Sequence, residues 1–318
     1  MTLKRRIVFY RSLSVALALR PAPFSSAAAY YSTSRMTFTT ERSSGTITVS
    51  PKNEGDQSAL VVISHGLGDT AEGFVDVAEN LATAMPHVKF ILPTAPTQKV
   101  TMNMGMSMPS WYDITGLDER SNENCAGIEN SRDTIVSILD REHQSTNLPY
   151  SRMVLAGFSQ GGALSLWTGM QLPQKLAGIV MMSAYLPAAK EFAITSGLED
   201  TPVLHCHGDV DPLVRLEMAT KTKEILTNAK GATAYELKTY AGLQHSVNMQ
   251  ELADVKKFLE TVLPPDDSCK IQLKDPGEMS VKELKAAIRK AGLGERSRGL
   301  MEKHEFIKLV QDHRNGKL

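Results

Sequence analysis

A sharp strand-to-helix turn around Ser159 constrains this chain more than any other feature. Residues 154–163 read Val-Leu-Ala-Gly-Phe-Ser-Gln-Gly-Gly-Ala, an apolar run that enters a Gly-x-Ser-x-Gly turn and continues into a helix-like segment. A turn of this kind holds a serine hydroxyl clear of the edge of a sheet. Glycines flank the serine because the turn is strained and neighbouring backbone passes close by. The pattern predicts that Ser159 is a catalytic nucleophile.

A serine hydroxyl needs a base, and the base needs an orienting carboxylate. After a serine on such a turn, the acid and then the base follow along the chain. Asp211 lies just past a strand-like segment (201–207), and Pro212 fixes the backbone after it. Asp209 is the competing acid, but it is better placed to brace the turn. We therefore expect Asp211 to be the orienting acid.

His245 is the candidate base. It lies in a loop between a strand-like segment (232–239) and a helical one (250–263). Open α/β sheets place their sites at the carboxyl ends of strands, where this loop begins. The alternative is a loop histidine that only caps the next helix.

Two backbone N–H groups are also needed, aimed at the oxyanion that forms during acyl transfer. The N–H of Gln160, directly after the nucleophile, is the first candidate. The second should come from an early loop after a strand, and the apolar run 59–64 ends in His65-Gly-Leu-Gly. The N–H of Leu67 is our candidate there, and an ordinary tight turn is the alternative.

A metal-dependent hydrolase is the main rival interpretation. His205, His207 and Asp209 match the start of a dinuclear metallo-hydrolase signature, and strand alternation places both imidazoles on one face. That signature continues with a histidine where this chain has Val210, and no second cluster supplies further ligands. We expect partly buried, hydrogen-bonded histidines, and no metal or organic cofactor.

Strand-like and helix-like segments alternate between residues 59 and 263. Such spacing implies an α/β fold with a mostly parallel, doubly wound sheet. Residues 46–49 are predicted to add an edge strand. The other predicted strands are 60–64, 90–92, 153–156, 177–183, 203–207 and 234–239.

Residues 93–123 are predicted to form a long irregular segment. Loops of this length are usually functional or disordered. Methionine side chains are flexible and polarisable, so they suit irregular apolar grooves. We interpret the segment as an acyl-chain groove or a lid over Ser159, the alternative being methionines that fill gaps in the core. The candidate groove residues are Met102, Met104, Met106, Met108 and Trp111.

Charge is unevenly distributed although the 35 basic and 35 acidic residues cancel. The first 40 residues contain six basic groups and no acid, whereas residues 267–318 carry a net charge of +4. The intervening residues 41–266 carry −10, which argues against nucleic-acid binding by this part of the chain.

Residues 1–35 have the composition of a removable targeting segment. They are rich in Arg, Ser and Ala and free of acids, which matches a mitochondrial presequence. Residues 12–19 could instead be the short apolar core of a secretory signal, but they are too few to span a membrane. We predict a mitochondrial protein, with a cytoplasmic form started at Met36 as the alternative.

Several motifs in one order resemble the acyl-protein thioesterases, a lysophospholipase/carboxylesterase group of the α/β-hydrolase fold. The resemblance spans residues 58–264 and implies a triad of Ser159, Asp211 and His245 with oxyanion N–H groups from Leu67 and Gln160. The motifs are His65-Gly-Leu-Gly-Asp-Thr, Ser110-Trp-Tyr-Asp-Ile, Gly157-Phe-Ser-Gln-Gly-Gly-Ala-Leu-Ser, Ser183-Ala-Tyr-Leu-Pro and His207-Gly-Asp-Val-Asp-Pro-Leu-Val.

The resemblance implies hydrolysis of long-chain S-acyl (palmitoyl) thioesters on protein cysteines, through an acyl-enzyme intermediate. Its substrates would be S-acylated proteins or lysophospholipids, and peripheral contact with a membrane stays open. A carboxylesterase or lysophospholipase that cleaves oxyesters with the same triad is the nearest alternative, because leaving-group preference depends on the groove. Members of the group lack the basic leader and the C-terminal tail, so location does not carry over.

The tail is predicted to be a separate module. We assign residues 41–264 to the catalytic domain, 265–278 to a linker and 279–314 to a helix-loop-helix. Ser280 and Glu283 form a capping box at the first helix, Gly292 ends it, and a second helix is predicted over 302–312. The arrangement resembles a SAP-type module. Because acids are interspersed with its bases, we expect a protein partner or simple helical packing, and no nucleic acid.

Overall fold

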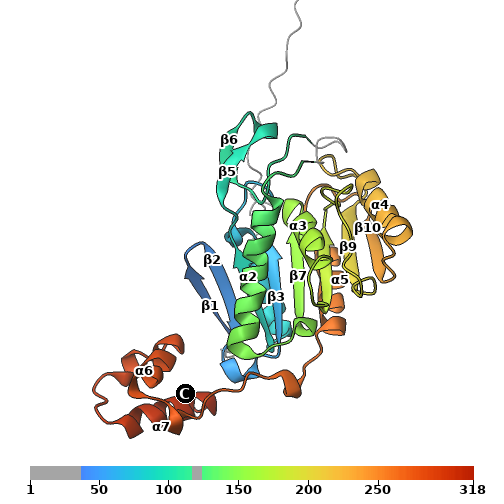
Figure 1. Ribbon diagram of the computed structural model, residues 1–318. Helices are drawn as coiled ribbons and strands as arrows, with labels where there is room; N and C mark the ends of the chain where they lie inside the picture. The colour runs from blue at the N-terminus through green and yellow to red at the C-terminus, as the bar shows by residue number, and fades with distance from the viewer. Residues whose placement is uncertain (1–36, 117–123) are drawn as a thin grey trace, which may run out of the picture.

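An eight-stranded sheet forms the centre of the molecule (Figure 1). The computed structural model describes residues 37–116 and 124–318. The strand order is β1-β2-β4-β3-β7-β8-β9-β10; the pairs β1–β2 and β2–β4 are antiparallel and the other pairs are parallel. The strands are β1 (Phe38–Ser43), β2 (Thr46–Pro51), β3 (Ala59–Ser64), β4 (Val88–Pro93), β7 (Met153–Phe158), β8 (Gly178–Met182), β9 (Val203–Gly208) and β10 (Tyr235–Tyr240).

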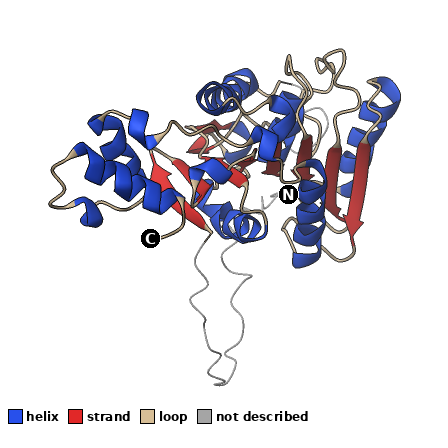
Figure 2. Ribbon diagram, turned by 90° about the horizontal axis from the view of Figure 1, so that it is seen from below, coloured by secondary structure: helices blue, strands red, loops and turns tan. Residues whose placement is uncertain are grey.

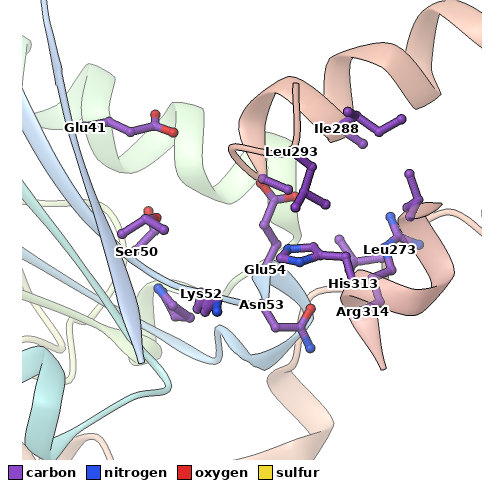
Figure 3. A pocket seen from close by; sticks show the side chains of 15 residues that line it. Glu41, Ser50, Lys52, Asn53, Glu54, Leu273, Ile288, Leu293, His313 and Arg314 are labelled. Carbon is purple, nitrogen blue, oxygen red and sulfur yellow. The ribbon is translucent and has the colours of Figure 1, made fainter. Parts of the chain in front are cut away.

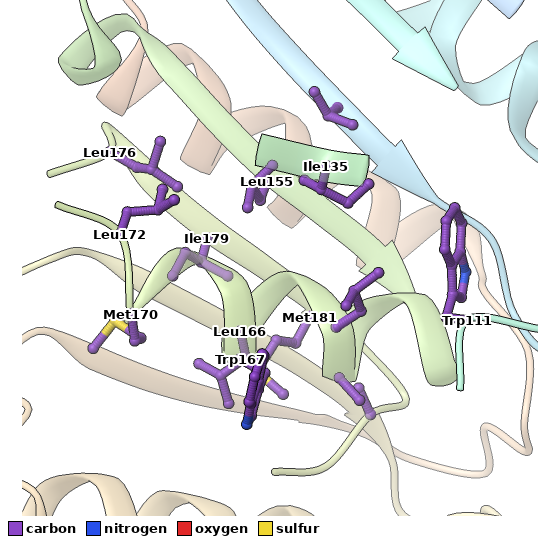
Figure 4. Packing of buried hydrophobic residues seen from close by; sticks show 14 of the residues in the cluster. Trp111, Ile135, Leu155, Leu166, Trp167, Met170, Leu172, Leu176, Ile179 and Met181 are labelled. Atoms are coloured by element: carbon purple, nitrogen blue, oxygen red, sulfur yellow. The ribbon is translucent and has the colours of Figure 1, made fainter. Parts of the chain in front are cut away.

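Helices cover both faces of the sheet because its central strands are apolar on both sides. All residues of β3 are buried, a continuous apolar run typical of a parallel strand covered on two faces. Leu60 and Val62 belong to the core under α2 and α3, which Figure 4 shows, while Val61 and Ile63 belong to the core under α1 and α5. The helices around the sheet are α1 (Val75–Ala84), α2 (Ile128–Thr146), α3 (Gln160–Gly169), α4 (Leu216–Glu224) and α5 (Met249–Val262).

The predicted α/β class and the strand predicted at residues 46–49 are confirmed, but the prediction that this strand lies at the edge of the sheet was wrong. These residues lie in β2, and β1 pairs outside it. The sequence of β1, Phe-Thr-Thr-Glu-Arg-Ser, is mostly polar, and its last three residues are exposed. Such a strand is held in place by its pairing with β2 and not by burial of its side chains. Its sequence therefore lacks the apolar pattern by which a strand is recognised.

The prediction of an irregular segment over residues 93–123 was also wrong in part. β5 (Thr97–Val100) and β6 (Met106–Pro109) form an antiparallel hairpin. Met104 and Gly105 have φ values of 58° and 73°, and this left-handed pair reverses the chain. Two four-residue strands joined through a short helical turn are too brief to be recognised from alternation. Residues 117–123 of the same prediction lie outside the described residues.

The last two helices form a small unit of their own. α6 (Val281–Lys290) and α7 (Lys303–Arg314) share a core of Leu284, Ile288, Phe306 and Val310. The capping box predicted at the start of α6 is present: the Ser280 hydroxyl accepts from the Glu283 N–H, and the Glu283 carboxylate accepts from the Ser280 N–H. Figure 2 shows this unit at one end of the molecule.

This C-terminal unit contacts the sheet domain at the amino ends of the parallel strands. In the linker that leads to the unit, the Ile271 N–H donates to the carbonyl of Gln57, two residues before β3. A shallow groove lies between the unit and the β1–β2 edge, with Lys52 and Glu54 on one side and Leu293 and His313 on the other (Figure 3). The unit is therefore remote from the carboxyl ends of the same strands.

The targeting role of the N-terminal segment remains a prediction after the fold is known. Residues 1–35, the proposed leader, lie outside the described residues. Among residues 37–116 and 124–318, no helix has the length and apolar character that crossing a bilayer requires.

One buried carboxyl group gives the fold a testable pH dependence. Glu251, in the first turn of α5, is fully buried, and neither of its carboxylate oxygens has a hydrogen-bond partner within the described part of the chain. Burial raises the pKa of Glu251 from 4.5 to about 8. Because the unfolded chain loses this proton first, the free energy of unfolding falls as the pH rises from about 4.5 to about 8.

We expect Glu251→Gln to be more stable than the parent chain at neutral pH. The difference in the free energy of unfolding should grow with pH over this window by at most about 1.4 kcal/mol per pH unit and then level off. Urea titrations of both proteins at several pH values measure it. A difference that is constant between pH 5 and pH 8 would contradict the assignment.

Candidate active site

Ser159 lies on the turn between β7 and α3 in a strained backbone conformation. Its φ and ψ are 52° and −118°, a region that L-residues rarely adopt, and its N–H donates to the carbonyl of Met182. The flanking glycines make the turn possible. A Cβ on Gly157 would lie 2.4 Å from the Gly161 carbonyl carbon, and one on Gly161 would lie 2.1 Å from the Ser64 carbonyl oxygen. Only glycine fits these two positions.

The structure brings Ser159, His245 and Asp211 into one hydrogen-bonded row. His245 Nε2 lies 3.0 Å from Ser159 Oγ, and His245 Nδ1 lies 2.7 Å from Asp211 Oδ2. Because a carboxylate only accepts, Nδ1 carries the proton and Nε2 is left to accept from the serine hydroxyl. The three side chains follow the carboxyl ends of β7, β9 and β10, which stand in the sheet in the order β7-β8-β9-β10.

Asp211 is held in place by backbone donors. Its Oδ1 accepts from the N–H groups of Leu213 and Val214, both at 2.9 Å, and its side chain is fully buried. Burial by itself raises the pKa of this carboxyl, but the hydrogen bond and charge of His245, with the two N–H groups, outweigh it and keep the pKa below 3.8. Asp211 is therefore a fixed negative charge beside the imidazole.

Asp209 binds a backbone N–H and not the imidazole that Asp211 binds. Its Oδ1 accepts from the N–H of Gly242 at 2.7 Å, so it ties the turn after β9 to the turn after β10. This contact is the bracing role expected from the sequence.

The two predicted oxyanion donors lie on either side of Ser159. Gln160 is the first residue of α3, so its N–H has no acceptor within the helix. A Cβ on Gly66 would lie 3.6 Å from Ser159 Cβ, which places the Gly66–Leu67 turn directly against the nucleophile. Within the described residues the Leu67 N–H makes no hydrogen bond. Both groups are available to a carbonyl oxygen bound at Ser159.

The five groove candidates occupy different environments. Met104 and Met106 are exposed at the tip of the β5–β6 hairpin, whereas Met102 and Met108 are half-buried. Trp111 differs from the expectation because its side chain is fully buried and its indole N–H donates to the carbonyl of His65. Trp111 therefore lines no open groove here, and the acyl-chain role of the methionines stays a prediction.

His205 and His207 are engaged in hydrogen bonds instead of forming an open pair of ligands. His207 Nε2–H donates to the Val214 carbonyl (2.7 Å), its Nδ1 faces His205 Nε2 (3.3 Å), and His205 Nδ1 accepts from the Tyr235 hydroxyl (2.6 Å). Burial lowers the pKa of both histidines, that of His205 to about 3. Both are fully buried, more than the sequence suggested.

His207 binds the carbonyl of Val214, and the N–H of Val214 donates to Asp211. The two histidines therefore help to hold the backbone that positions the acid. Across the parts of the chain that the structure describes, no group of three or more His, Cys, Asp or Glu side chains is arranged to hold a metal ion.

The site also depends on side chains that sequence reasoning did not assign. The carboxamide of Gln160 binds the segment 110–112, and the His65 ring binds the carbonyl of Gly66. Only the backbone N–H of Gln160 was expected to act. A signal was nonetheless present, since a glutamine at the start of a helix without charged residues needs partners for its amide when buried.

Comparison with known proteins gives a consistent result. A model of the Phospholipase/Carboxylesterase family matches residues 46–263. Acyl-protein thioesterase 1 of Mycosarcoma maydis is 39% identical over 233 residues, which cover 69% of this chain and 97% of that protein. Acyl-protein thioesterase 1 of Gibberella zeae is 41% identical over 219 residues, covering 65% of this chain and 92% of that protein.

A solved structure shares the fold. The crystal structure of acyl-protein thioesterase 2 of Zea mays matches with a TM-score of 0.62 and 26% identity, over 69% of this chain and 98% of that one. The family match ends at residue 263, before α6 and α7 begin.

The different contacts of Asp211 and Asp209 give a paired prediction. Asp211→Asn should lower kcat by on the order of 10⁴ with little change in KM, because the amide favours the wrong imidazole tautomer. Asp209→Asn, the matched control, should keep kcat and lower only the melting temperature. Steady-state kinetics on any acyl ester that the protein turns over measures both. Equal losses of kcat in the two variants would contradict the assignment.

Proposed function

The chain belongs to the phospholipase/carboxylesterase family, and we propose that it is a serine hydrolase that removes long-chain S-acyl groups from protein cysteines. The observation that carries the proposal is the placement of the His245 imidazole, 3.0 Å from Ser159 Oγ and 2.7 Å from Asp211 Oδ2. Relatives named acyl-protein thioesterase 1 at 39% and 41% identity support the thioester as substrate.

Acylation begins with the serine hydroxyl. His245 Nε2 takes the proton as Ser159 Oγ attacks the acyl carbonyl carbon, and the negative charge passes to the carbonyl oxygen. The N–H groups of Leu67 and Gln160 are placed to donate to that oxygen. When the intermediate collapses, the carbon–sulfur bond breaks, the thiolate takes the proton from the imidazolium, and the acyl group stays on Ser159 as an ester.

Deacylation repeats the sequence with water. His245 Nε2 takes a proton from water as its oxygen attacks the ester carbonyl, and the same two N–H groups receive the oxyanion. Collapse returns the proton to Ser159 Oγ and releases the fatty acid. Throughout, Asp211 holds Nδ1–H and stabilises the charged imidazole, and a negative charge fixed in a buried site does this more strongly than one in water. The sequence of steps uses no cofactor.

A second candidate function uses the same residues. The description of the family supports cleavage of carboxylic and phospholipid oxyesters, and lysophospholipids would be the natural substrates of this kind. Ser159, Asp211 and His245 can cleave a thioester or an oxyester. The substrate preference therefore depends on the sites that bind the acyl chain and the leaving group. We place the acyl chain along the β5–β6 hairpin, where Met104 and Met106 are exposed and Met108 lies beside Gly68.

The remaining assignments are proposals from the sequence. We propose S-acylated proteins as substrates, mitochondrial location through residues 1–35 with a cytoplasmic form from Met36, and a protein partner for α6 and α7. Peripheral contact with a membrane would bring the enzyme to lipid-anchored substrates. The C-terminal unit has no expected part in the chemistry, because it contacts the opposite ends of the strands.

Substrate class is tested with matched palmitoyl thioester and palmitoyl oxyester substrates. We expect residues 36–318 to cleave the thioester with the higher kcat/KM, and Ser159→Ala to reduce both activities at least about 10⁴-fold. Serine-dependent cleavage with equal or greater oxyester turnover would favour the second candidate function. Thioester cleavage that survives Ser159→Ala would contradict both.

The separation of the C-terminal unit from the site gives a further prediction. A chain that ends at residue 266 should keep the kcat and KM of the full chain on a small acyl ester, since the removed residues contact the β1–β2 edge and the amino ends of the parallel strands, away from Ser159. Parallel kinetics and thermal unfolding of the two proteins measure this. A loss of kcat in a shortened chain that still unfolds cooperatively would assign α6 and α7 a role in catalysis.

A further inference from the structure

The two proposed oxyanion donors come from separate parts of the chain. The Leu67 N–H belongs to the turn after β3, and the Gln160 N–H belongs to the start of α3. Donors of this kind stabilise a transition state only when they are oriented before the reaction. Something must therefore fix the direction of each N–H and the spacing between them.

The peptide group that carries the Leu67 N–H is held by its own carbonyl. His65 Nε2 accepts from the N–H of Ala95 (3.0 Å), so the ring proton is on Nδ1, which donates to the Gly66 carbonyl oxygen (2.7 Å). The Gly66 carbonyl and the Leu67 N–H belong to one planar trans peptide and point in opposite directions. By fixing the carbonyl, His65 fixes where the N–H points and opposes a flip of this peptide.

The His65 ring is suited to this task because it stays neutral. It is buried, and burial lowers its pKa. A neutral imidazole has one donor and one acceptor, and both are used here. The tautomer is therefore set by its two partners.

Trp111 holds the same turn from the other side. Its indole N–H donates to the His65 carbonyl oxygen (2.8 Å), and its ring centroid lies 5.1 Å from that of His65. The Trp111 carbonyl in turn accepts from the Ser131 hydroxyl of α2. Trp111 thus fixes the peptide directly before the one that His65 fixes.

The carboxamide of Gln160 joins this assembly to the second donor. Its Oε1 accepts from the Trp111 N–H (2.9 Å), and its Nε2 donates to the Tyr112 carbonyl (2.7 Å) and the Ser110 hydroxyl (3.0 Å). A backbone N–H only donates and a carbonyl only accepts, so the orientation of the amide is determined. Gln160 therefore offers one oxyanion N–H with its backbone and binds Trp111 with its side chain. Trp111 in turn holds the turn that carries the Leu67 N–H.

We infer that His65, Trp111 and the side chain of Gln160 form a hydrogen-bonded clamp that presets the oxyanion hole, a role that rests on the proposed function. Trp111 is a positioning residue in this clamp: it touches no substrate and acts through the turn that carries Leu67. The clamp removes the reorganisation that two independent loops would need as the oxyanion forms.

Trp111→Phe tests the clamp because it keeps an aromatic ring and removes the indole N–H, together with some ring volume, a loss that the control below shares. With a 4-nitrophenyl ester as substrate, we expect kcat to fall by about 10- to 100-fold with KM nearly unchanged, since loss of a whole oxyanion donor costs about 10²- to 10³-fold. Inhibition by a long-chain trifluoromethyl ketone, which forms a tetrahedral adduct with Ser159, should weaken by a similar factor.

Trp167→Phe is the matched control. Trp167 lies in the same buried cluster (Figure 4), and its indole nitrogen has no hydrogen-bond partner among the described residues. The Trp167→Phe variant should lose stability as Trp111→Phe does. Its kcat and its affinity for the ketone should equal those of the parent chain. Equal kinetics in Trp111→Phe and Trp167→Phe, or a Trp111→Phe effect confined to KM, would overturn the inference.

A second measurement is independent of catalysis. ¹⁵N NMR of histidine-labelled protein, assigned with His65→Gln, should show the His65 proton on Nδ1 and a neutral ring at pH 7. A proton on Nε2 or a charged ring would overturn the clamp even if the protein cleaves thioesters. Conversely, the predicted tautomer in a protein that cleaves no ester would leave the clamp standing and reject the proposed function.

Discussion

The strained turn at Ser159 is the constraint on which the site depends. A φ of 52° at a residue with a side chain persists only when the surrounding structure enforces it. Here the Ser159 N–H bonds to β8, and the backbone of β3 lies so close to Gly161 that no side chain would fit there. The same approach of β3 brings the turn after it, with Gly66 and Leu67, against the nucleophile. The contact between Gly161 and β3 therefore positions both the Ser159 hydroxyl and the turn that carries the Leu67 N–H.

The sheet explains why the three reacting side chains meet. Ser159, Asp211 and His245 are separated by 52 and 34 positions in the chain, yet each follows a strand of one group of neighbours in the sheet. Parallel strands end at the same edge, so residues just past their carboxyl ends converge. The linker to the C-terminal unit is bound at the opposite ends of these strands, at Gln57, and the unit itself lies beside β1 and β2. The architecture thus separates the chemistry from the added helices, which leaves their groove available for another task.

The catalytic residues were easier to predict from the sequence than the residues and strands that position them. The turn glycines, the order of acid and base, and the apolar parallel strands each leave a local pattern, so the sheet and the meeting of Ser159, Asp211 and His245 could be expected. The edge strand β1 could not, because it is mostly polar and held by pairing, and the β5–β6 hairpin could not, because its strands have only four residues each. The burial of Trp111 was also beyond prediction, since it depends on His65 and Gln160, which lie 46 and 49 positions away.

Detection of the acyl-enzyme is the most direct test of Ser159 as the nucleophile that receives the acyl group. The protein would be mixed with a palmitoyl thioester, quenched in acid within the first turnovers, digested and examined by mass spectrometry. We expect a palmitoyl ester on the peptide that contains Ser159, and none in the Ser159→Ala variant. Rapid release of the fatty acid with no acylated peptide at any quench time, or acylation of a different residue, would contradict it.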